Sequence, residues 1–199
     1  MRSFTPPGAP GRCPRCLMLL DYCLCELVGT ARDSRPQIFI VRHQWEAFKS
    51  TGTARLAGLA LANASVVDMA AENPEPVREH LRNLEDAWLL HPGHAETGPL
   101  REPPRTLVVL DGTWRQTRKM LRRLPELARL PRFSLPPDAS GATRDRLREA
   151  PRPGARSTLE SIAEALGALE SPETGRWLLE LHAEFVARTR HARGQRYES

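Results

Sequence analysis

The sequence predicts an α/β domain with a largely parallel sheet and flanking helices, preceded by a small cysteine-rich segment. Segments of β-rich composition alternate with helical segments along most of the chain, which is typical of strands joined by helical crossovers. The chain has 199 residues, of which 40% are apolar, and this is enough for one globular core. We therefore expect residues 1–30 to hold a flexible N-terminus and a zinc knuckle of four cysteines, and residues 31–199 to form the α/β domain.

Five short segments have the composition of strands. The apolar runs QIFIV and TLVVL suit strands that are buried on both faces of a parallel sheet. The other segments are shorter or more mixed in composition. In chain order, the predicted strands are residues 37–41, 65–69, 87–90, 106–110 and 132–135.

Five helices are predicted between and after these strands. The helix that follows the TLVVL run has Trp114, Met120 and Leu124 close to one face. Ser157 and Glu160 fit a capping box, with Ser157 at the N-cap and Glu160 at the third helical position. The predicted helices are residues 54–62, 77–86, 113–124, 157–169 and 172–190.

Positive charge gathers in one stretch of the chain. The formal net charge is +5, but residues 101–156 alone contain 14 basic and 6 acidic residues. Of the 29 basic residues, all except Lys49 and Lys119 are arginine, whose planar guanidinium pairs with phosphate and stacks on bases. A GC-rich genome explains the choice of Arg over Lys, whereas the clustering favours contact with RNA over a merely solvated face.

Nothing in the sequence indicates a membrane-spanning or secreted protein. No apolar run approaches the roughly 18 residues that span a bilayer, and the N-terminus lacks the apolar region of a signal peptide. We therefore expect a cytoplasmic protein, in which clustered cysteines favour a metal over disulfides.

The cysteines follow the spacing Cys13-x2-Cys16-x6-Cys23-x-Cys25. Four thiolates in thirteen residues can close a tetrahedral zinc site, although this spacing differs from that of common zinc fingers. A redox pair at Cys13 and Cys16, or thiols without a role, are the alternatives. Bound zinc would replace a hydrophobic core in a segment too short to fold alone.

Asp111 is the residue best placed for chemistry. It ends a predicted strand, Gly112 permits a sharp turn, and a helix follows at once. Ligands of parallel α/β sheets bind beyond the carboxyl ends of the strands, where a helix N-terminus adds free N–H groups and partial positive charge. Asp is also a favoured N-cap, so helix capping is the alternative role of Asp111, as core packing is for Trp114.

Two further segments are expected near the same edge. At the start of the predicted helix 157–169, Ser157, Thr158 and Glu160 could hold a polar cofactor, although capping alone accounts for them. The polar, Gly-containing segment 42–55 joins a strand to a helix and can bind phosphate, but it lacks the Walker A pattern.

Together these motifs resemble the DTW-domain family, the tRNA-uridine aminocarboxypropyltransferases. The family's Asp-x-Thr-Trp signature is matched by residues 111–114, and its Ser-Thr-x-Glu element by residues 157–160. One departure is His91, where family members tend to have Tyr. The other matching features, in a similar order along residues 13–185, are the cysteine cluster, Arg42-His43, Thr53-Ala54-Arg55-Leu56, Leu90-x-Pro92 and Arg146-Leu147-Arg148.

The resemblance implies a fold related to SPOUT RNA methyltransferases, with a C-terminal trefoil knot around S-adenosylmethionine. It implies transfer of the 3-amino-3-carboxypropyl group from S-adenosylmethionine to N3 of a uridine in tRNA, releasing methylthioadenosine. The uridine must be unpaired or pulled out of its helix, because N3 faces its pairing partner. The expected partners are tRNA and S-adenosylmethionine, the expected metal is structural zinc, and we favour a monomer.

Several residues receive roles from these motifs and from the charge pattern. Asp111 is the candidate to take the N3 proton, and its alternative role is to bind the amino group of the cofactor. The residues implied as catalytic are Asp111, Thr113 and Trp114. Those implied to bind the cofactor are Leu90, His91, Pro92, Leu110, Gly112, Ser157, Thr158 and Glu160. Those expected to bind metal are Cys13, Cys16, Cys23 and Cys25. Those expected to contact RNA are Arg42, His43, Lys49, Arg55, Arg115, Arg118, Lys119, Arg122, Arg144, Arg146, Arg148 and Arg152.

Three alternative functions remain open from the sequence. A SPOUT-type RNA methyltransferase would release S-adenosylhomocysteine in place of methylthioadenosine. A transferase acting on ribosomal RNA would have the same charge pattern. A non-catalytic, zinc-dependent RNA-binding protein would have no affinity for S-adenosylmethionine.

Overall fold

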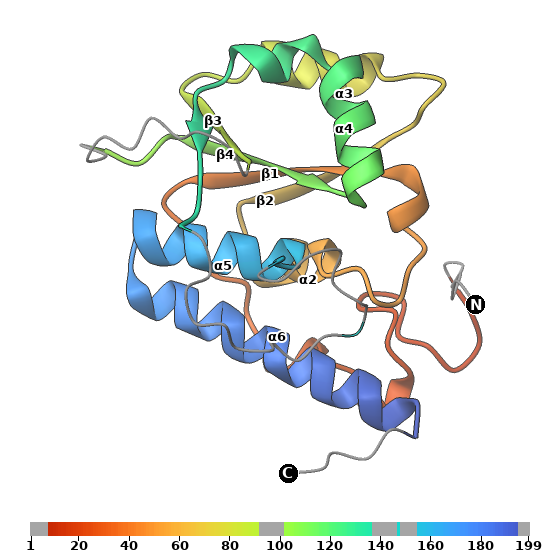
Figure 1. The fold of residues 1–199 in the computed structure, drawn as a ribbon. Coiled ribbons are helices and arrows are strands. Elements are labelled where there is room, and N and C mark those ends of the chain that lie inside the picture. Colours follow the sequence, from red (N-terminus) through yellow and green to blue (C-terminus); the bar gives the residue numbers. More distant parts are fainter. Residues whose placement is uncertain (1–7, 92–101, 137–146, 148–154, 195–199) are drawn as a thin grey trace.

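A twisted sheet with helices on both faces forms the centre of the protein (Figure 1). The computed structural model describes residues 8–91, 102–136, 147 and 155–194. Every strand pair is parallel, and the order across the sheet is β2-β1-β4-β3-β5. The strands are β1 (Gln37–His43), β2 (Ala64–Met69), β3 (Ala87–Leu90), β4 (Thr106–Asp111) and β5 (Arg132–Phe133).

The central strands β1 and β4 are buried on both faces. Their register pairs Ile38 with Leu107 and Ile40 with Val109, and these side chains enter one core. Phe39 and its neighbours at alternate positions enter a second core on the other face. This double burial explains the unbroken apolar runs in the sequence and confirms the predicted parallel α/β sheet.

Helices cover both faces of the sheet (Figure 1). The core on one face is formed with α3 (Glu75–Arg82) and α4 (Trp114–Arg123). The core on the other face is formed with α2 (Ala54–Ala60), α5 (Thr158–Leu169) and α6 (Pro172–Ala192). The short helical segments are η1 (Leu20–Tyr22), α1 (Cys25–Val28), η2 (Gln44–Glu46) and η3 (Pro125–Arg129). Within the described ranges, no helix is both long and apolar enough to cross a bilayer.

The predicted helix 77–86 is displaced in the structure. α3 begins at Glu75, with Pro76 in its first turn, where the missing N–H of proline costs no helical hydrogen bond. It ends at Arg82, because the chain must turn before β3. At this turn Asp86 has a φ of 45°. The Asp86 carboxylate accepts a hydrogen bond from the backbone N–H of Arg105 at 3.0 Å.

The cysteine-rich segment packs against the C-terminal half of α6. Thr189 Oγ1 donates to Met18 Sδ at 3.5 Å, and Arg188 Nη1 donates to the carbonyl of Cys23 at 2.5 Å. The segment therefore shares the core that α5 and α6 form on the sheet. Its buried members in that core are Cys13, Cys16, Met18, Leu24 and Val28.

The close approach of α5 and α6 depends on one glycine. A Cβ at Gly175 would lie 2.7 Å from the carbonyl oxygen of Ala163 and 2.9 Å from Cα of Gly167. A Cβ at Gly167 would meet nothing nearer than Cα of Gly175 at 3.7 Å, which is an ordinary contact. Only Gly175 is therefore required by the packing of the two helices.

We expect Gly175→Ala to lower the free energy of unfolding by about 1–3 kcal/mol, because the added methyl overpacks a backbone contact that cannot yield locally. Gly167→Ala is the matched control and should be neutral or stabilising by up to about 1 kcal/mol, since Ala favours the helix. Urea denaturation followed by circular dichroism measures both variants. Equal stabilities of the two variants would contradict this packing.

Candidate active site

The carboxyl ends of the parallel strands bring three of the predicted motifs to one edge of the sheet. Asp111 ends β4, His43 ends β1, and His91 follows β3. The start of α5 reaches the same place from a different layer: Thr158 Oγ1 donates a hydrogen bond to Asp111 Oδ1 at 2.5 Å. Segments far apart in the sequence thus converge on the Asp111 carboxylate.

Asp111 is not a helix cap. It is the last residue of β4, only 6% of it is exposed, and the N-cap of α4 is Thr113. The alternative that Asp111 only caps the helix is therefore wrong. A Cβ at Gly112 would lie 3.1 Å from Cβ of Gln116, so this glycine lets the chain turn closely over the start of α4.

Thr113 accounts for the capping of α4. Its hydroxyl accepts from the backbone N–H of Gln116 at 3.3 Å, and the Gln116 side-chain oxygen accepts from the Thr113 N–H at 2.6 Å. This reciprocal arrangement is a capping box, which satisfies helix N–H groups that have no partner within the helix. The Asp111 carboxylate takes no part in this capping.

A second capping box begins α5, as the sequence predicts. The Ser157 hydroxyl accepts from the Glu160 N–H at 3.2 Å, and Glu160 Oε2 accepts from the Ser157 N–H at 2.7 Å. The structure adds His182, which the sequence did not single out. Its Nε2 lies 3.1 Å from Ser157 Oγ and 3.9 Å from Glu160 Oε2.

The sequence contains a signal that could have found His182. It falls on the face of the last helix that also carries Leu178, Leu181 and Phe185, and a polar residue there must find a partner when buried. Only 8% of His182 is exposed. Its partner Ser157 could not be identified without knowing how α6 packs on α5.

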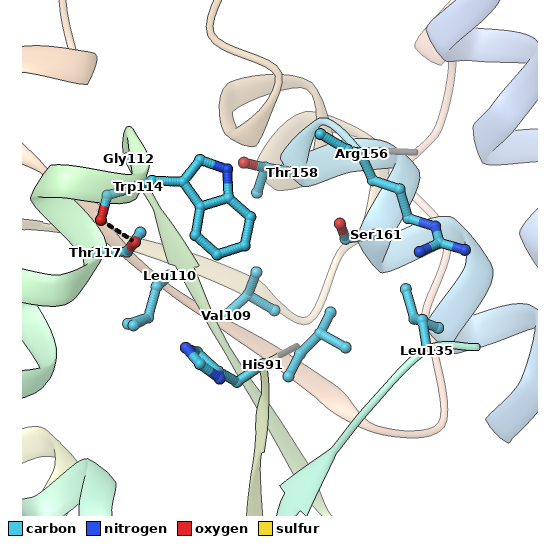
Figure 2. Close-up of a pocket in the computed structure, with 12 residues that line it drawn as sticks. His91, Val109, Leu110, Gly112, Trp114, Thr117, Leu135, Arg156, Thr158 and Ser161 are labelled. Carbon is cyan, nitrogen blue, oxygen red and sulfur yellow. Dashed lines mark hydrogen bonds between the residues drawn. The ribbon is translucent and has the colours of Figure 1, made fainter. Parts of the chain in front are cut away.

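A cavity of about 180 Å³ lies between the ends of β3 and β4 and the start of α5. Figure 2 shows the indole of Trp114 beside Thr158, with the apolar side chains of Val109 and Leu110 below them. Arg156 and Ser161 supply polar groups on the α5 side. The lining residues are Leu90, His91, Val109, Leu110, Gly112, Trp114, Thr117, Leu135, Ala155, Arg156, Thr158 and Ser161.

A larger cavity of about 440 Å³ adjoins the first. The two share Gly112, Trp114, Ala155, Arg156 and Thr158, so Trp114 and Thr158 lie at their boundary. Groups of both charge signs line the larger cavity. Its acidic members are Glu46, Asp111 and Glu160, its cationic members are Arg115 and Arg156, and the remainder are Thr51, Gly52, Thr53, Gly112, Thr113, Trp114, Leu147, Ala155, Ser157, Thr158, His182, Phe185 and Val186.

All the described residues that the sequence assigned to the cofactor line one of these cavities. Pro92 lies outside the described residues. Arg156 lines both cavities, but the sequence motifs did not identify it as a site residue. Its guanidinium donates to the carbonyl of Pro136 at 2.8 Å and pairs with Glu164 at 2.8 Å. Its sequence context, a Pro- and Gly-rich stretch, gave no indication of a fixed position.

The cations of the 42–55 segment are engaged within the protein. Arg42 makes two hydrogen bonds to Asp68, at 2.6 and 3.0 Å, and Lys49 pairs with Glu46. Arg55 donates to the backbone carbonyls of Ala47 and Lys49, and burial lowers the pKa of its guanidinium. These groups shape the loop, and their contact with RNA stays a prediction.

The basic residues of α4 face solvent. Within the part of the chain that the structure describes, none of the four predicted RNA-binding side chains on this helix forms an ion pair. They are Arg115, Arg118, Lys119 and Arg122. The other predicted phosphate contacts lie outside the described residues; these are Arg144, Arg146, Arg148 and Arg152.

The four cysteine sulfurs form one cluster and lie within 4.8 Å of one another. The Sγ atoms of Cys13 and Cys25 are 3.6 Å apart, and those of Cys16 and Cys23 are 3.8 Å apart; none forms a disulfide. A tetrahedral site with zinc–sulfur bonds of about 2.3 Å requires sulfurs about 3.8 Å apart. The donor set and spacing therefore fit a tetrahedral metal ion.

The thiols of the cluster differ in acidity. Burial raises the pKa of Cys13, but hydrogen bonds from the backbone at Cys16 and Arg15 outweigh it and lower the pKa to about 6. Burial raises the pKa of Cys16 and of Cys25. At least one thiolate is therefore available at neutral pH to begin binding a metal.

His43 connects β1 to the start of α4. Its Nδ1 accepts from the backbone N–H of Trp45 at 3.3 Å and lies 3.3 Å from Gln116 Nε2. Burial lowers its pKa, and the charges of Lys119, Lys49 and Arg123 act in the same direction, against the opposing effect of Glu46. Neutral imidazole is therefore the form that holds this junction together.

The lowered pKa of His43 has a consequence for stability. The folded state binds the proton of His43 less readily than the unfolded chain does. Above about pH 7 His43 is neutral in both states and should not change how the free energy of unfolding depends on pH. As the pH falls below about 6.5, the unfolded chain takes up the proton first, so the free energy of unfolding should fall. His43→Asn is the matched variant, because its side-chain oxygen can accept from Trp45 without titrating. Urea denaturation from about pH 8 to about pH 5 should show the wild type losing more stability than the variant. Parallel pH profiles would contradict this role.

A family model and a curated relative both match most of the chain. The model of the DTW domain matches residues 11–190. The chain is 31% identical over 180 residues to tRNA-uridine aminocarboxypropyltransferase 2 of Drosophila melanogaster, a match that covers 85% of this chain and 70% of the relative. No solved structure matches the chain significantly.

Proposed function

The chain belongs to the DTW-domain family, and we propose that it transfers the 3-amino-3-carboxypropyl group of S-adenosylmethionine to N3 of a uridine in tRNA. One observation carries this proposal: the buried carboxylate of Asp111 lines the larger of two adjoining cavities, and Trp114 and Thr158 lie at their boundary. A donor and an acceptor can then occupy neighbouring spaces, with Asp111 beside the acceptor.

The smaller cavity suits the nucleoside part of the donor. Its floor is apolar, formed by side chains such as Val109 and Leu110, and the Trp114 indole stands beside it. A flat, mostly apolar base is bound by such surfaces. The hydroxyls of Thr158 and Ser161 donate to Asp111 and to the carbonyl of Ser157, and their oxygens can still accept hydrogen bonds from polar groups at the edge. S-adenosylmethionine would supply an electrophilic methylene attached to its sulfonium.

The larger cavity suits the uracil and the charged end of the transferred arm. The arm carries an ammonium and a carboxylate, and the cavity offers Glu160 and Glu46 for the first and Arg115 and Arg156 for the second. Fixing both ends of the arm would aim its methylene, and orientation of this kind can supply much of the rate enhancement.

Asp111 would act on the acceptor. Uridine N3 is a weak acid that is largely protonated at neutral pH, so its proton must leave as the new N–C bond forms. The bond between the methylene and the sulfonium sulfur breaks in the same step, and methylthioadenosine leaves. The Thr158 hydroxyl fixes one oxygen of Asp111, which orients the carboxylate toward the cavity that it lines. We infer that Asp111 accepts this proton as a general base.

The exposed cations of α4 support an RNA substrate. They begin at Arg115, which lines the larger cavity, and continue along the solvent-facing side of the helix. Phosphate contacts from such a row would orient the RNA without reading its sequence. The uridine would enter the cavity unpaired, as in a tRNA loop.

We further infer a SPOUT-like knot in the C-terminal half. β5 lies at the edge of the sheet beside β3, but the chain returns from it to Thr158, which contacts Asp111 at the end of β4. The knot itself is a proposal based on the family resemblance.

Asp111→Asn keeps the shape of the side chain and removes the base. We expect the rate of uridine modification to fall by about 10²- to 10⁴-fold, the usual contribution of a general base, while the affinity for S-adenosylmethionine stays close to that of the wild type. Mass spectrometry of tRNA nucleosides and of the by-product measures turnover, and calorimetry measures cofactor binding.

Glu85→Gln is the matched control, since it makes the same chemical change at an exposed residue that lines neither cavity and pairs with Arg105. It should retain normal turnover. Normal turnover by Asp111→Asn would eliminate the base role, and lost cofactor binding would favour the role of amino-group anchor. S-adenosylhomocysteine as by-product would indicate a methyltransferase.

We propose that zinc occupies the cysteine cluster and stabilises the segment against α6. The purified protein should contain about one zinc per chain, and removing it with a chelator should lower the thermal midpoint, because metal binding is coupled to the folding of such segments. Metal analysis and thermal denaturation with and without chelator test this, and Cys16→Ser should reproduce the loss. Unchanged stability in a metal-free protein with all thiols titratable would contradict the proposal.

A further inference from the structure

Trp45 is an exposed aromatic side chain at the ligand edge of the sheet. It follows β1 within η2, and 60% of its surface is exposed. The other large apolar residues found exposed among those described, Leu20 and Leu27, lie in the cysteine-rich segment. The next residue, Glu46, is buried and lines the larger cavity, so the backbone that carries Trp45 adjoins the wall of that cavity.

The backbone that carries Trp45 is held from both sides. Its N–H donates to His43 Nδ1, and His43 is in turn next to Gln116 of α4. On the other side, Glu46 pairs with Lys49, and the guanidinium of Arg55 holds the carbonyls that follow. An indole on a backbone fixed in this way can bind a flat partner at a small cost in conformational entropy.

The electrostatic surroundings of Trp45 favour a polyanion. The imidazole that binds its N–H experiences one negative charge, that of Glu46, which pairs with Lys49, and three positive charges, those of Lys119, Lys49 and Arg123. The exposed cations of α4, beginning with Arg115, continue this positive surface. An exposed aromatic ring beside cations that can contact phosphates is the arrangement by which proteins bind unpaired nucleotides.

We propose that Trp45 stacks on an unpaired base of the substrate RNA, next to the uridine that enters the larger cavity. The inference rests on the proposed function for the identity of the RNA, and it adds a contact that neither the signature motifs nor the cysteine cluster contains. Stacking on a flanking base would hold the RNA while the target uridine leaves its own stack, which costs energy in any enzyme that extrudes a base.

The test uses the full chain and a tRNA transcript that carries no modifications. Trp45→Ala should weaken RNA affinity by roughly 5- to 150-fold, the equivalent of one lost base–aromatic stack, and Trp45→Phe should restore most of it. Leu20→Ala is the control, because it removes an equally exposed apolar side chain from a different surface, and it should bind as the wild type does. Affinity is measured by fluorescence anisotropy of a labelled RNA.

Two further measurements separate stacking from a structural effect. Trp45→Ala should bind S-adenosylmethionine as tightly as the wild type in calorimetry, and its RNA affinity should keep the same salt dependence, because no phosphate contact is lost. Lys119→Ala should instead lower the salt dependence. Of the other tryptophans, Trp88 and Trp177 are partly buried and line neither cavity, whereas Trp114 lines both. Quenching of the indole fluorescence by RNA should therefore fall in Trp45→Phe to the part that Trp114 contributes.

Unchanged RNA affinity in Trp45→Ala, or equal losses in the Ala and Phe variants, would overturn the stacking proposal while leaving the transferase proposal intact. A loss of cofactor affinity in Trp45→Ala would overturn it as well, since the effect would then be structural. A wild-type protein that binds RNA through Trp45 but modifies no uridine would retain this inference and refute the proposed function.

Discussion

The parallel pairing of β1 with β4 is the constraint on which the rest of the structure depends. Because both strands run in the same direction, the chain must cross over between them, and helices come to cover both faces of the sheet. The same pairing brings the carboxyl ends of the strands together, so His43 and Asp111 lie at one edge although 68 residues separate them in the sequence. The cavities are therefore a consequence of strand direction.

Burial of acidic groups at this edge is possible because each has a defined partner. Asp111 accepts from Thr158, Glu160 accepts from the Ser157 N–H, and Glu46 pairs with Lys49. An isolated carboxylate in the same position would be too costly to desolvate and would become protonated. In the two capping boxes, Thr113 and Ser157 accept hydrogen bonds from the first N–H groups of α4 and α5. Asp111 therefore does not serve as a cap for either helix.

Local patterns in the sequence were sufficient to predict the strands, the positions of most helices and the capping box at Ser157. Each depends on residues close in the chain: an apolar run, a helical period, or a hydroxyl three residues before a carboxylate. The DTW signature also pointed to Asp111, because this residue ends a strand and ligands of parallel sheets bind beyond the carboxyl ends of the strands.

The remaining features depend on contacts between distant segments. His182 lies 25 residues beyond Ser157, and their hydrogen bond exists only because α6 folds back on α5. Arg42 was expected to face RNA, yet it meets Asp68 because β1 and β2 pair in a register that sets the two residues side by side. The exposure of Trp45 could not be predicted for the same reason, because the neighbours of a tryptophan in the sequence do not determine whether its side chain is buried.

The position of the cysteine-rich segment shows why it belongs with the α/β domain. α6 carries Phe185 and Val186 in the lining of the larger cavity, and one turn further on Arg188 and Thr189 contact the cysteine-rich segment. A shift of that segment would move the same helix turn that shapes the cavity wall, because side chains in a close-packed core cannot move independently. The four cysteines therefore lie far from the Asp111 signature in sequence but are joined to its cavity through the C-terminal helix.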